Sequence, residues 1–436
     1  MADRRVVVTG LGVVTAVGVG AEEYWTALCE GRSGVKPISR FDASGFSSRV
    51  GGELADFSAR KYVPRSYRKS VKVMARDIEI AVAAADLSFR HAGITTRAAD
   101  AEMDIDPKRL GCNVGAGLMC TDLDELGGAV NTAVVDGRFD LKAWGRQGME
   151  NLTPLWLLKY LPNMLACHVT IIHGCEGPSN NITCGDVSGH LGVAESADWV
   201  RRGEADVAIA GGAESKLNPM GLLRQSLLGR LCTERNDAPA EACRPFDAEH
   251  CGAVVGEGSG MIVLEDLDRA LARGATIYAE VVGAGAACDP KGFEVTRPSV
   301  GSLDLAVKKA LTAAGVGPED LGLLVAHGTA VPEEDRLEAA AWGEALGDRA
   351  AQVPAAAVTG ATGLLFAGAG GVELATAALA LKNQTVPPTV NFGGADEGCS
   401  LALGREARSA EIEYVVSGAF ATGGQSAACV LKRYEP

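Results

Sequence analysis

The chain has 436 residues, 47% of them hydrophobic and 22% charged, which is ordinary for a soluble globular protein with a sizeable core. Its formal net charge of -14 disfavours nucleic acid or an anionic membrane as the main partner. The 12 cysteines lack paired C-x-x-C spacing, and no apolar run reaches about 18 residues. We therefore expect reduced thiols in a cytoplasmic protein without a secretory signal or a membrane span.

Near the N-terminus a predicted strand runs into a glycine-rich turn that invites comparison with a dinucleotide-binding loop. Its glycines, Gly10, Gly12 and Gly18, are spaced G-x-G-x5-G rather than G-x-G-x-x-G. Val13 and Val14 also prolong the apolar run instead of opening a helix. We therefore expect no nicotinamide cofactor, and the sequence indicates no other cofactor.

Five basic residues lie close together in an otherwise acidic chain: Arg65, Arg68, Lys69, Lys72 and Arg76. Lys69, Lys72 and Arg76 have the spacing that places side chains on one face of a helix. One interpretation is a solvated helix face, and the other is a docking patch for an acidic partner. The residues by themselves leave both open.

A second group combines residue types that bind metals: Cys167, His168, His173, Cys175 and Cys184. Their spacing matches no closed zinc pattern, and an apolar run separates His168 from His173. We therefore expect the edges of a buried element here, and no metal.

Residues 177–203 predict a strand, a tight turn at Gly185 and Asp186, and a helix. Apolar residues recur at helical spacing from residue 187 to 200, and Gly203 closes the helix. Asp186 thus lies on a strand-to-helix elbow, at the positive end of a helix dipole. Many enzymes present a nucleophile at such an elbow, whereas this chain presents a carboxylate.

Strands alternate with helices again after residue 274. Buried strands are predicted at residues 277–283, 323–326 and 355–358, and a helix at residues 372–382. This alternation predicts a layered α/β fold with two halves, 1–274 and 275–436, and with ligands near the strand ends.

Five motifs, in their order and spacing, resemble those of the elongating β-ketoacyl-acyl-carrier-protein synthases. They are Gly177-Pro-Ser179, the run GEADVAIAGGAE at 203–214, Arg244-Pro-Phe-Asp247, His327-Gly-Thr329 and Val386-Pro-Pro-Thr-Val-Asn391. The likeness covers nearly the whole chain. It implies the thiolase fold, with two duplicated halves in a five-layered α-β-α-β-α arrangement, and a dimer.

The family's chemistry uses an elbow cysteine, two histidines and a supporting lysine. The cysteine takes an acyl chain from an acyl carrier protein, and the histidines assist decarboxylation and stabilise the enolate. In this chain the resemblance places Asp186 at the position of the cysteine, and His327 and Leu364 at the positions of the two histidines. Thr359 stands at the position of the lysine, and Thr422 at that of a gating phenylalanine. Asp335 and Glu373 match supporting acids of the family. The chemistry is thus altered at several positions while the scaffold motifs remain. Arg68, Lys69 and Lys72 match the family's carrier-protein docking position.

Two hypotheses follow from Asp186. An acyl-aspartate would be a mixed anhydride prone to hydrolysis, so the first hypothesis is a condensation-incompetent subunit of fatty-acid or type II polyketide biosynthesis. Such a subunit is similar to chain-length factors and forms a heterodimer with an active synthase; a homodimer is the alternative. Known chain-length factors typically carry Gln at this elbow, so Asp186 departs from their pattern.

The second hypothesis is a stand-alone hydrolase, acyltransferase or decarboxylase of acyl thioesters that uses Asp186 and His327. Cys184 is a further candidate nucleophile, since residues 184 and 186 point to the same side of a strand. It precedes the turn, however, away from the helix terminus that would activate it. We therefore favour a buried structural role for Cys184.

Overall fold

The computed structural model describes residues 4–99, 101–290 and 302–435. A 12-stranded sheet runs through the molecule, and it consists of two five-stranded halves with matching topology plus two short strands. The first half, in sheet order, is β8 (Ser179–Ile182), β5 (Leu110–Ala116), β9 (Val207–Ser215), β10 (Glu257–Asp266) and β1 (Val6–Thr15). The second is β13 (Pro354–Ala357), β12 (Leu321–Ala326), β17 (Tyr414–Phe420), β18 (Gln425–Lys432) and β11 (Ala279–Cys288). β2 (Gly18–Val19) pairs with β1, and β15 (Ala402–Leu403) pairs with β13.

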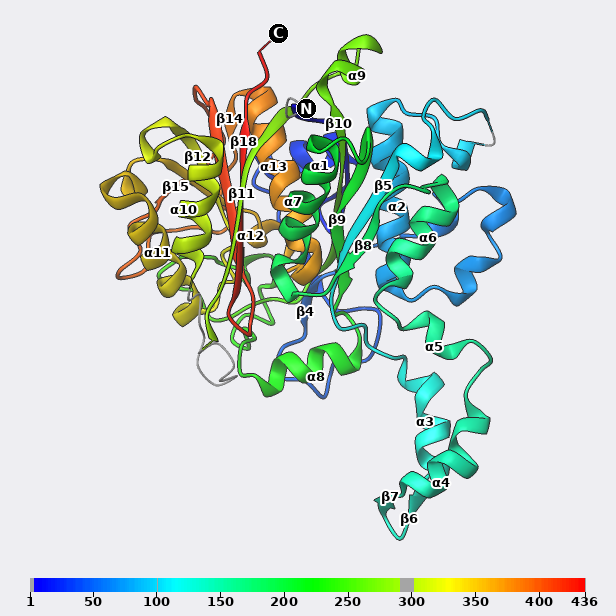
Figure 1. Ribbon diagram of the computed structural model, residues 1–436. Coiled ribbons are helices and arrows are strands. Elements are labelled where there is room, and N and C mark those ends of the chain that lie inside the picture. Colours follow the sequence, from blue (N-terminus) through cyan, green and yellow to red (C-terminus); the bar gives the residue numbers. More distant parts are fainter. Residues whose placement is uncertain (1–3, 100, 291–301, 436) are drawn as a thin grey trace.

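Both halves use the same strand directions, which supports the predicted duplication. In each half the first three strands are mutually parallel and the last two are antiparallel to their neighbours. The halves join where β1 and β11 meet, and only two residue pairs link these strands: Val7 with Glu280 and Val8 with Ala279. The joined sheet therefore folds over itself, and its two halves face each other across a layer of helices (Figure 1).

Helices fill the space between the halves and cover both outer faces (Figure 1). The inner layer consists of α1 (Ala21–Cys29), α7 (Ser188–Arg201) and α13 (Ala369–Asn383). α2 (Arg76–Ala92) and α6 (Met164–His173) cover the first half, and α10 (Leu303–Ala314) and α11 (Pro332–Leu346) cover the second. This is the five-layered α-β-α-β-α arrangement of the thiolase fold that the sequence predicts.

The inner layer is packed closely enough to require glycine. A Cβ atom added to Gly260 of β10 would lie 2.1 Å from the backbone carbon of Gly371 in α13. One added to Gly189 of α7 would lie 2.7 Å from the Gly371 nitrogen. These glycines let α7, α13 and the sheet approach each other, which brings the N-terminal ends of α7 and α13 together at the site described below.

Residues 120–160 form an arm that projects from the body (Figure 1). Its elements are α3 (Leu123–Thr132), β6 (Val134–Val135), β7 (Arg138–Phe139), α4 (Leu141–Arg146) and α5 (Trp156–Lys159). Large apolar side chains on the arm are exposed, including Leu141 at 74% and Leu155 at 64%.

The remaining elements are short. They are β3 (Val35–Pro37) paired with β4 (Val50–Gly52), β14 (Thr385–Val386) paired with β16 (Arg408–Ser409), and the helices α8 (Pro219–Leu227), α9 (Leu267–Ala272) and α12 (Thr359–Thr362). Among the described residues, no helix combines the length and the apolar composition needed to cross a membrane.

Two sequence predictions are wrong. Cys232 and Cys251 form a disulfide, so the cysteines are not all reduced thiols; the ten others are free. Lys69, Lys72 and Arg76 do not share one helix, because Lys72 lies in the 3-10 turn Ser70–Val73, Lys69 precedes that turn, and only Arg76 belongs to α2. The Arg76 guanidinium bonds to Glu257 at 2.8 and 2.9 Å, because a fully buried carboxylate needs a cation beside it.

Candidate functional site

The elbow has the predicted form. β8 ends at Ile182, Gly185 adopts a φ of 59°, and a 3-10 turn at Gly185–Val187 leads into α7. The Ser188 hydroxyl braces this turn, because it accepts the Cys184 N–H at 2.9 Å and donates to the Gly185 carbonyl at 2.6 Å. Asp186 is buried, with 8% of its surface exposed.

Asp186 meets His327, which follows β12 in the other half. The His327 Nε2 lies 3.3 Å from the Asp186 Oδ2, and its Nδ1 lies 2.8 Å from the Glu373 Oε1 of α13. Burial alone would lower the pKa of His327, but Glu373 and Asp186 together raise this pKa well above its ordinary value. The result is a buried carboxylate–imidazolium–carboxylate line in which both ring nitrogens are engaged.

Two further acids hold the loop that carries His327. Glu338 accepts the backbone N–H groups of His327 and Gly328, each at 2.8 Å, and burial raises the pKa of Glu338 to about 7. Asp335 accepts the N–H of Ala330 at 3.1 Å, while the Thr359 hydroxyl donates to the Gly328 carbonyl. Asp335 and Thr359 therefore support the loop and do not touch Asp186.

Leu364 and Thr422 bring no hydrogen-bonding group into the interior of this site. Leu364 is fully buried in an apolar cluster with Leu217, Leu231 and other aliphatic side chains, so its side chain offers no donor. Thr422 is exposed on the turn between β17 and β18. The preceding residue of that turn lies against the elbow, since a Cβ atom at Gly185 would be 3.1 Å from the Ala421 Cβ.

Sequence reasoning missed Glu338 and two further charged or polar neighbours of the site. Arg230 is paired with Glu334 at 2.7 Å, and both Glu334 and Asp186 raise the pKa of Arg230 against the effect of burial. His190 lies 3.6 Å from the free oxygen of Glu373, and burial lowers the pKa of His190 to about 4. His190 follows Asp186 by four residues, and this helical spacing was the signal for it.

The other residues that the sequence singles out lie apart from the line of Asp186, His327 and Glu373. Arg68, Lys69 and Lys72 are exposed before α2: Arg68 and Lys69 lie between two 3-10 turns, and Lys72 lies in the second of them. Cys184 is half-buried, and burial raises the pKa of its thiol. Its neighbours include Val187 and Ala421.

The histidines of the second sequence cluster bond to side chains of other elements. His168 bonds to the Tyr67 hydroxyl at 2.8 Å, and His173 to the Thr96 hydroxyl at 2.9 Å. Within the described ranges no group of three or more His, Cys, Asp or Glu side chains is arranged to hold a metal ion.

Comparison with known proteins covers the whole chain. Residues 3–270 match the model of the β-ketoacyl synthase N-terminal domain, and residues 278–393 match that of the C-terminal domain. The 3-oxoacyl-[acyl-carrier-protein] synthase 2 of Coxiella burnetii is 33% identical over 436 residues, 99% of each chain. The enzyme of the same description from Vibrio cholerae is 33% identical over 99% of this chain and 100% of its own.

Solved structures agree with this. The ishigamide ketosynthase/chain length factor superposes with a TM-score of 0.83 at 30% identity and full coverage of both chains. A type II polyketide synthase structure, AntDE:AntF, contains an acyl carrier protein in complex with its ketosynthase; it superposes with a TM-score of 0.82 at 26% identity over 99% of this chain and 100% of its own.

Proposed function

The chain belongs to the β-ketoacyl synthase family, and from that premise we propose that it is a ketosynthase-like subunit that no longer condenses acyl chains. In this proposal it acts in the cytoplasm as a chain-length-factor-like partner of an active synthase, in fatty-acid or type II polyketide biosynthesis. The observation that carries the proposal is the contact between Asp186 and His327.

That contact leaves the site without the groups that condensation needs. A carboxylate cannot form the acyl thioester that a thiolate forms; its acyl derivative is a mixed anhydride, which hydrolyses readily. Both nitrogens of His327 are already bound by carboxylates, and Leu364 has no donor to offer an oxyanion. The loss of one such donor costs about 2.7–4 kcal/mol of transition-state stabilisation in other enzymes.

The surface supports a partner subunit. β8 is the edge strand of the sheet beside the elbow, and Ser179 and Asn180 on it are exposed. The arm exposes a set of large apolar side chains: Leu123, Val134, Val135, Phe139, Leu141, Met149, Leu155, Leu157 and Leu158. An open sheet edge and an apolar patch of this kind are covered in stable proteins. We propose that the half formed by residues 1–274 supplies these dimer contacts.

The second proposed partner is an acyl carrier protein. Arg68, Lys69 and Lys72 are exposed and form no ion pair within the described part of the chain, so their charges can attract an acidic surface. The polyketide synthase neighbour, which contains a carrier protein bound to its ketosynthase, supports this assignment by analogy.

The test combines assembly with acylation. The chain is purified alone and co-expressed with a synthase that has an intact cysteine and two histidines, and each sample is incubated with radiolabelled acyl-carrier protein. We expect a heterodimer by size-exclusion chromatography with light scattering, and label on the synthase only. Stable label on this chain would contradict the proposal.

A matched pair of variants tests the interface. Leu141→Asp places a charge on the apolar arm and should abolish or strongly weaken the heterodimer. Leu271→Asp changes a leucine of α9 that is likewise exposed, at 51%, but lies off the arm; it should leave assembly intact.

A stand-alone acyl-thioester enzyme is the second candidate, and the orientation of His327 by Glu373 favours it. With His327 held in place by Glu373 and facing Asp186, the Asp186 carboxylate can act as the general base that takes a proton from a bound water. This candidate requires a homodimer that releases free acid or carbon dioxide from acyl thioesters. Asp186→Asn should then abolish the release without affecting assembly, and absence of any release from the purified chain removes the candidate.

A further inference from the structure

The disulfide joins two segments that are also held together by their backbones. Cys232 and Cys251 are 19 residues apart, with a Cα–Cα distance of 4.9 Å. Cys232 donates its N–H to the Ala253 carbonyl at 2.9 Å, and Ala253 donates to the Arg230 carbonyl at 2.7 Å. The disulfide therefore closes a loop whose base is a short backbone ladder.

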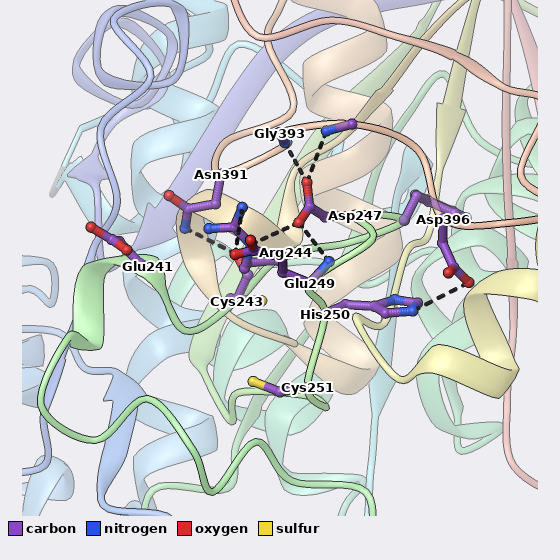
Figure 2. Close-up of polar contacts among 12 residues, drawn as sticks. Glu241, Cys243, Arg244, Asp247, Glu249, His250, Cys251, Asn391, Gly393 and Asp396 are labelled. Atoms are coloured by element: carbon purple, nitrogen blue, oxygen red, sulfur yellow. Dashed lines mark hydrogen bonds and ion pairs between the residues drawn. The ribbon is translucent and has the colours of Figure 1, made fainter.

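The closed loop carries a dense set of polar contacts (Figure 2). The Asp247 carboxylate accepts from Arg244 and from the Glu249 N–H, each at 2.9 Å, and from the backbone of Gly393. Next to it, the His250 Nε2 lies 3.4 Å from the Asp396 Oδ2. Through these contacts the loop anchors the chain segment after residue 390.

The same loop holds the start of α11, just after His327. The Asp335 carboxylate accepts the Phe246 N–H at 2.7 Å and lies 3.2 Å from the His250 Nδ1. Gly252, next to Cys251, donates to the Ala330 carbonyl at 3.1 Å. At the other end of the disulfide, Arg230 reaches Glu334 of the same helix. Both ends of the disulfide thus support the loop that presents His327 to Asp186.

We propose that Cys232–Cys251 is a reversible dithiol–disulfide site, reduced by a dithiol of the thioredoxin class, that sets how firmly the His327 loop is held. A disulfide framework would use several cysteines, whereas this chain keeps ten free ones beside a single bond. In a reducing compartment such as the cytoplasm proposed above, a disulfide is usually transient and either catalytic or redox-sensing. The inference stands whichever activity the elbow has.

The chemistry balances with the dithiol as the only co-reactant. Its thiolate attacks the Cys251 sulfur, which is the partly exposed one of the pair, and the disulfide bond breaks. The electron pair goes to the Cys232 sulfur, which is buried and takes up a proton. The second thiol of the reductant then attacks the mixed disulfide, releases the Cys251 thiol and leaves with a disulfide of its own.

A third cysteine nearby does not compete. Cys243 is fully buried in the same apolar cluster as Cys232, and burial raises the pKa of its thiol to about 12. Its thiol is therefore protonated and a poor nucleophile toward the disulfide. Reduction should expose Cys251 first and leave Cys243 unlabelled.

The test begins with the wild-type chain purified without reductant. Peptide mass spectrometry should find the Cys232–Cys251 linkage, and maleimide labelling of the unfolded chain should gain two thiols when the protein is first reduced with dithiothreitol. Hydrogen exchange with and without dithiothreitol should then show faster exchange in peptides 244–253 and 327–335, by about tenfold or more, because the cross-link restricts local opening. Re-oxidation should restore the slow exchange.

Variants separate the disulfide from general effects of the reductant. Cys232→Ser with Cys251→Ser should exchange fast with or without dithiothreitol, whereas Cys288→Ser, at an exposed free cysteine, should respond like the wild type. If the double variant does not fold, the reductant titration of the wild type still decides. Free thiols at both positions in the unreduced protein, or unchanged exchange in 327–335 on reduction, would overturn the proposal.

Discussion

Replacing Glu373 with Gln is the most direct test of the carboxylate–imidazolium–carboxylate line formed by Asp186, His327 and Glu373. The Glu373 side chain is fully buried, and its Oε1 lies 2.8 Å from the His327 Nδ1. Gln keeps the shape and removes the charge. Two unit charges about 4 Å apart interact by about 4 kcal/mol at an effective dielectric constant of about 20, which corresponds to about 3 pKa units. Relaxation of the surroundings reduces this interaction, but the pKa of His327 should still fall in Glu373→Gln, because the largest contribution that raises it is removed while burial still lowers it.

The assay is histidine NMR over a pH series, which is feasible because the chain has only 6 histidines. Asp186→Asn should lower the pKa of His327 by a smaller amount, because its contact is longer, at 3.3 Å, and its side chain is less buried. Glu334→Gln is the control: this buried carboxylate pairs with Arg230 and does not touch His327. A His327 pKa that moves by less than about half a unit in Glu373→Gln would refute the ion-pair explanation.

The same contact has a consequence for stability. The folded-state pKa of His327 is raised, so the native state binds a proton more tightly than the unfolded chain. The stabilisation is therefore complete below the unfolded pKa of histidine, about 6.5, and is lost as the pH rises through the raised pKa. In Glu373→Gln the stabilisation should be smaller and its loss should be complete at a lower pH, which denaturant unfolding over a pH series will show.

Three further predictions concern the surface and the core. Lys69→Glu with Lys72→Glu should weaken acyl-carrier-protein binding in titration calorimetry and make the remaining affinity less sensitive to salt; unchanged affinity would assign these lysines to a solvated surface. Burial raises the pKa of Asp77 to about 7, so the native state keeps a proton that the unfolded chain releases near pH 4, and stability should fall as pH rises through this window. Asp77→Asn should flatten that slope in thermal unfolding. Gly260→Ala should destabilise the fold by about 2 kcal/mol or more, because the added Cβ atom meets the backbone of α13. Gly343→Ala on α11 is the control: its Cβ atom would enter open space, so this variant should be neutral or stabilising by up to about 1 kcal/mol. Equal melting temperatures for these two variants would contradict the packing argument.

The layered fold and the form of the elbow followed from the sequence because both depend on local patterns. A strand, a Gly185 turn and a helical repeat are encoded within a few neighbouring residues. The order of the family motifs then places His327 and Glu373 near Asp186, and the structure brings the three into contact. Their chemical roles stay a prediction.

What the sequence did not show depends on contacts between distant segments. Arg76 fits a basic helix face by spacing alone, but its guanidinium pairs with Glu257, which lies 181 residues later. Glu338 supports the His327 loop from inside α11, where a glutamate would ordinarily be read as solvent-exposed. The spacing of Cys232 and Cys251 matches no disulfide pattern. The two cysteines meet because backbone hydrogen bonds between residues 230–232 and 253 bring their segments together.

The replacement at the elbow is physically coherent with the groups around it. A carboxylate at the N-terminal end of α7 is favoured by the helix dipole, and His327 supplies the cation that a buried carboxylate requires. Glu373 in turn stabilises that cation. The three side chains therefore satisfy one another and need no substrate to do so. This closed arrangement of charges, together with the exposed sheet edge and the apolar arm, agrees with the proposal that the chain supports the chemistry of a partner subunit.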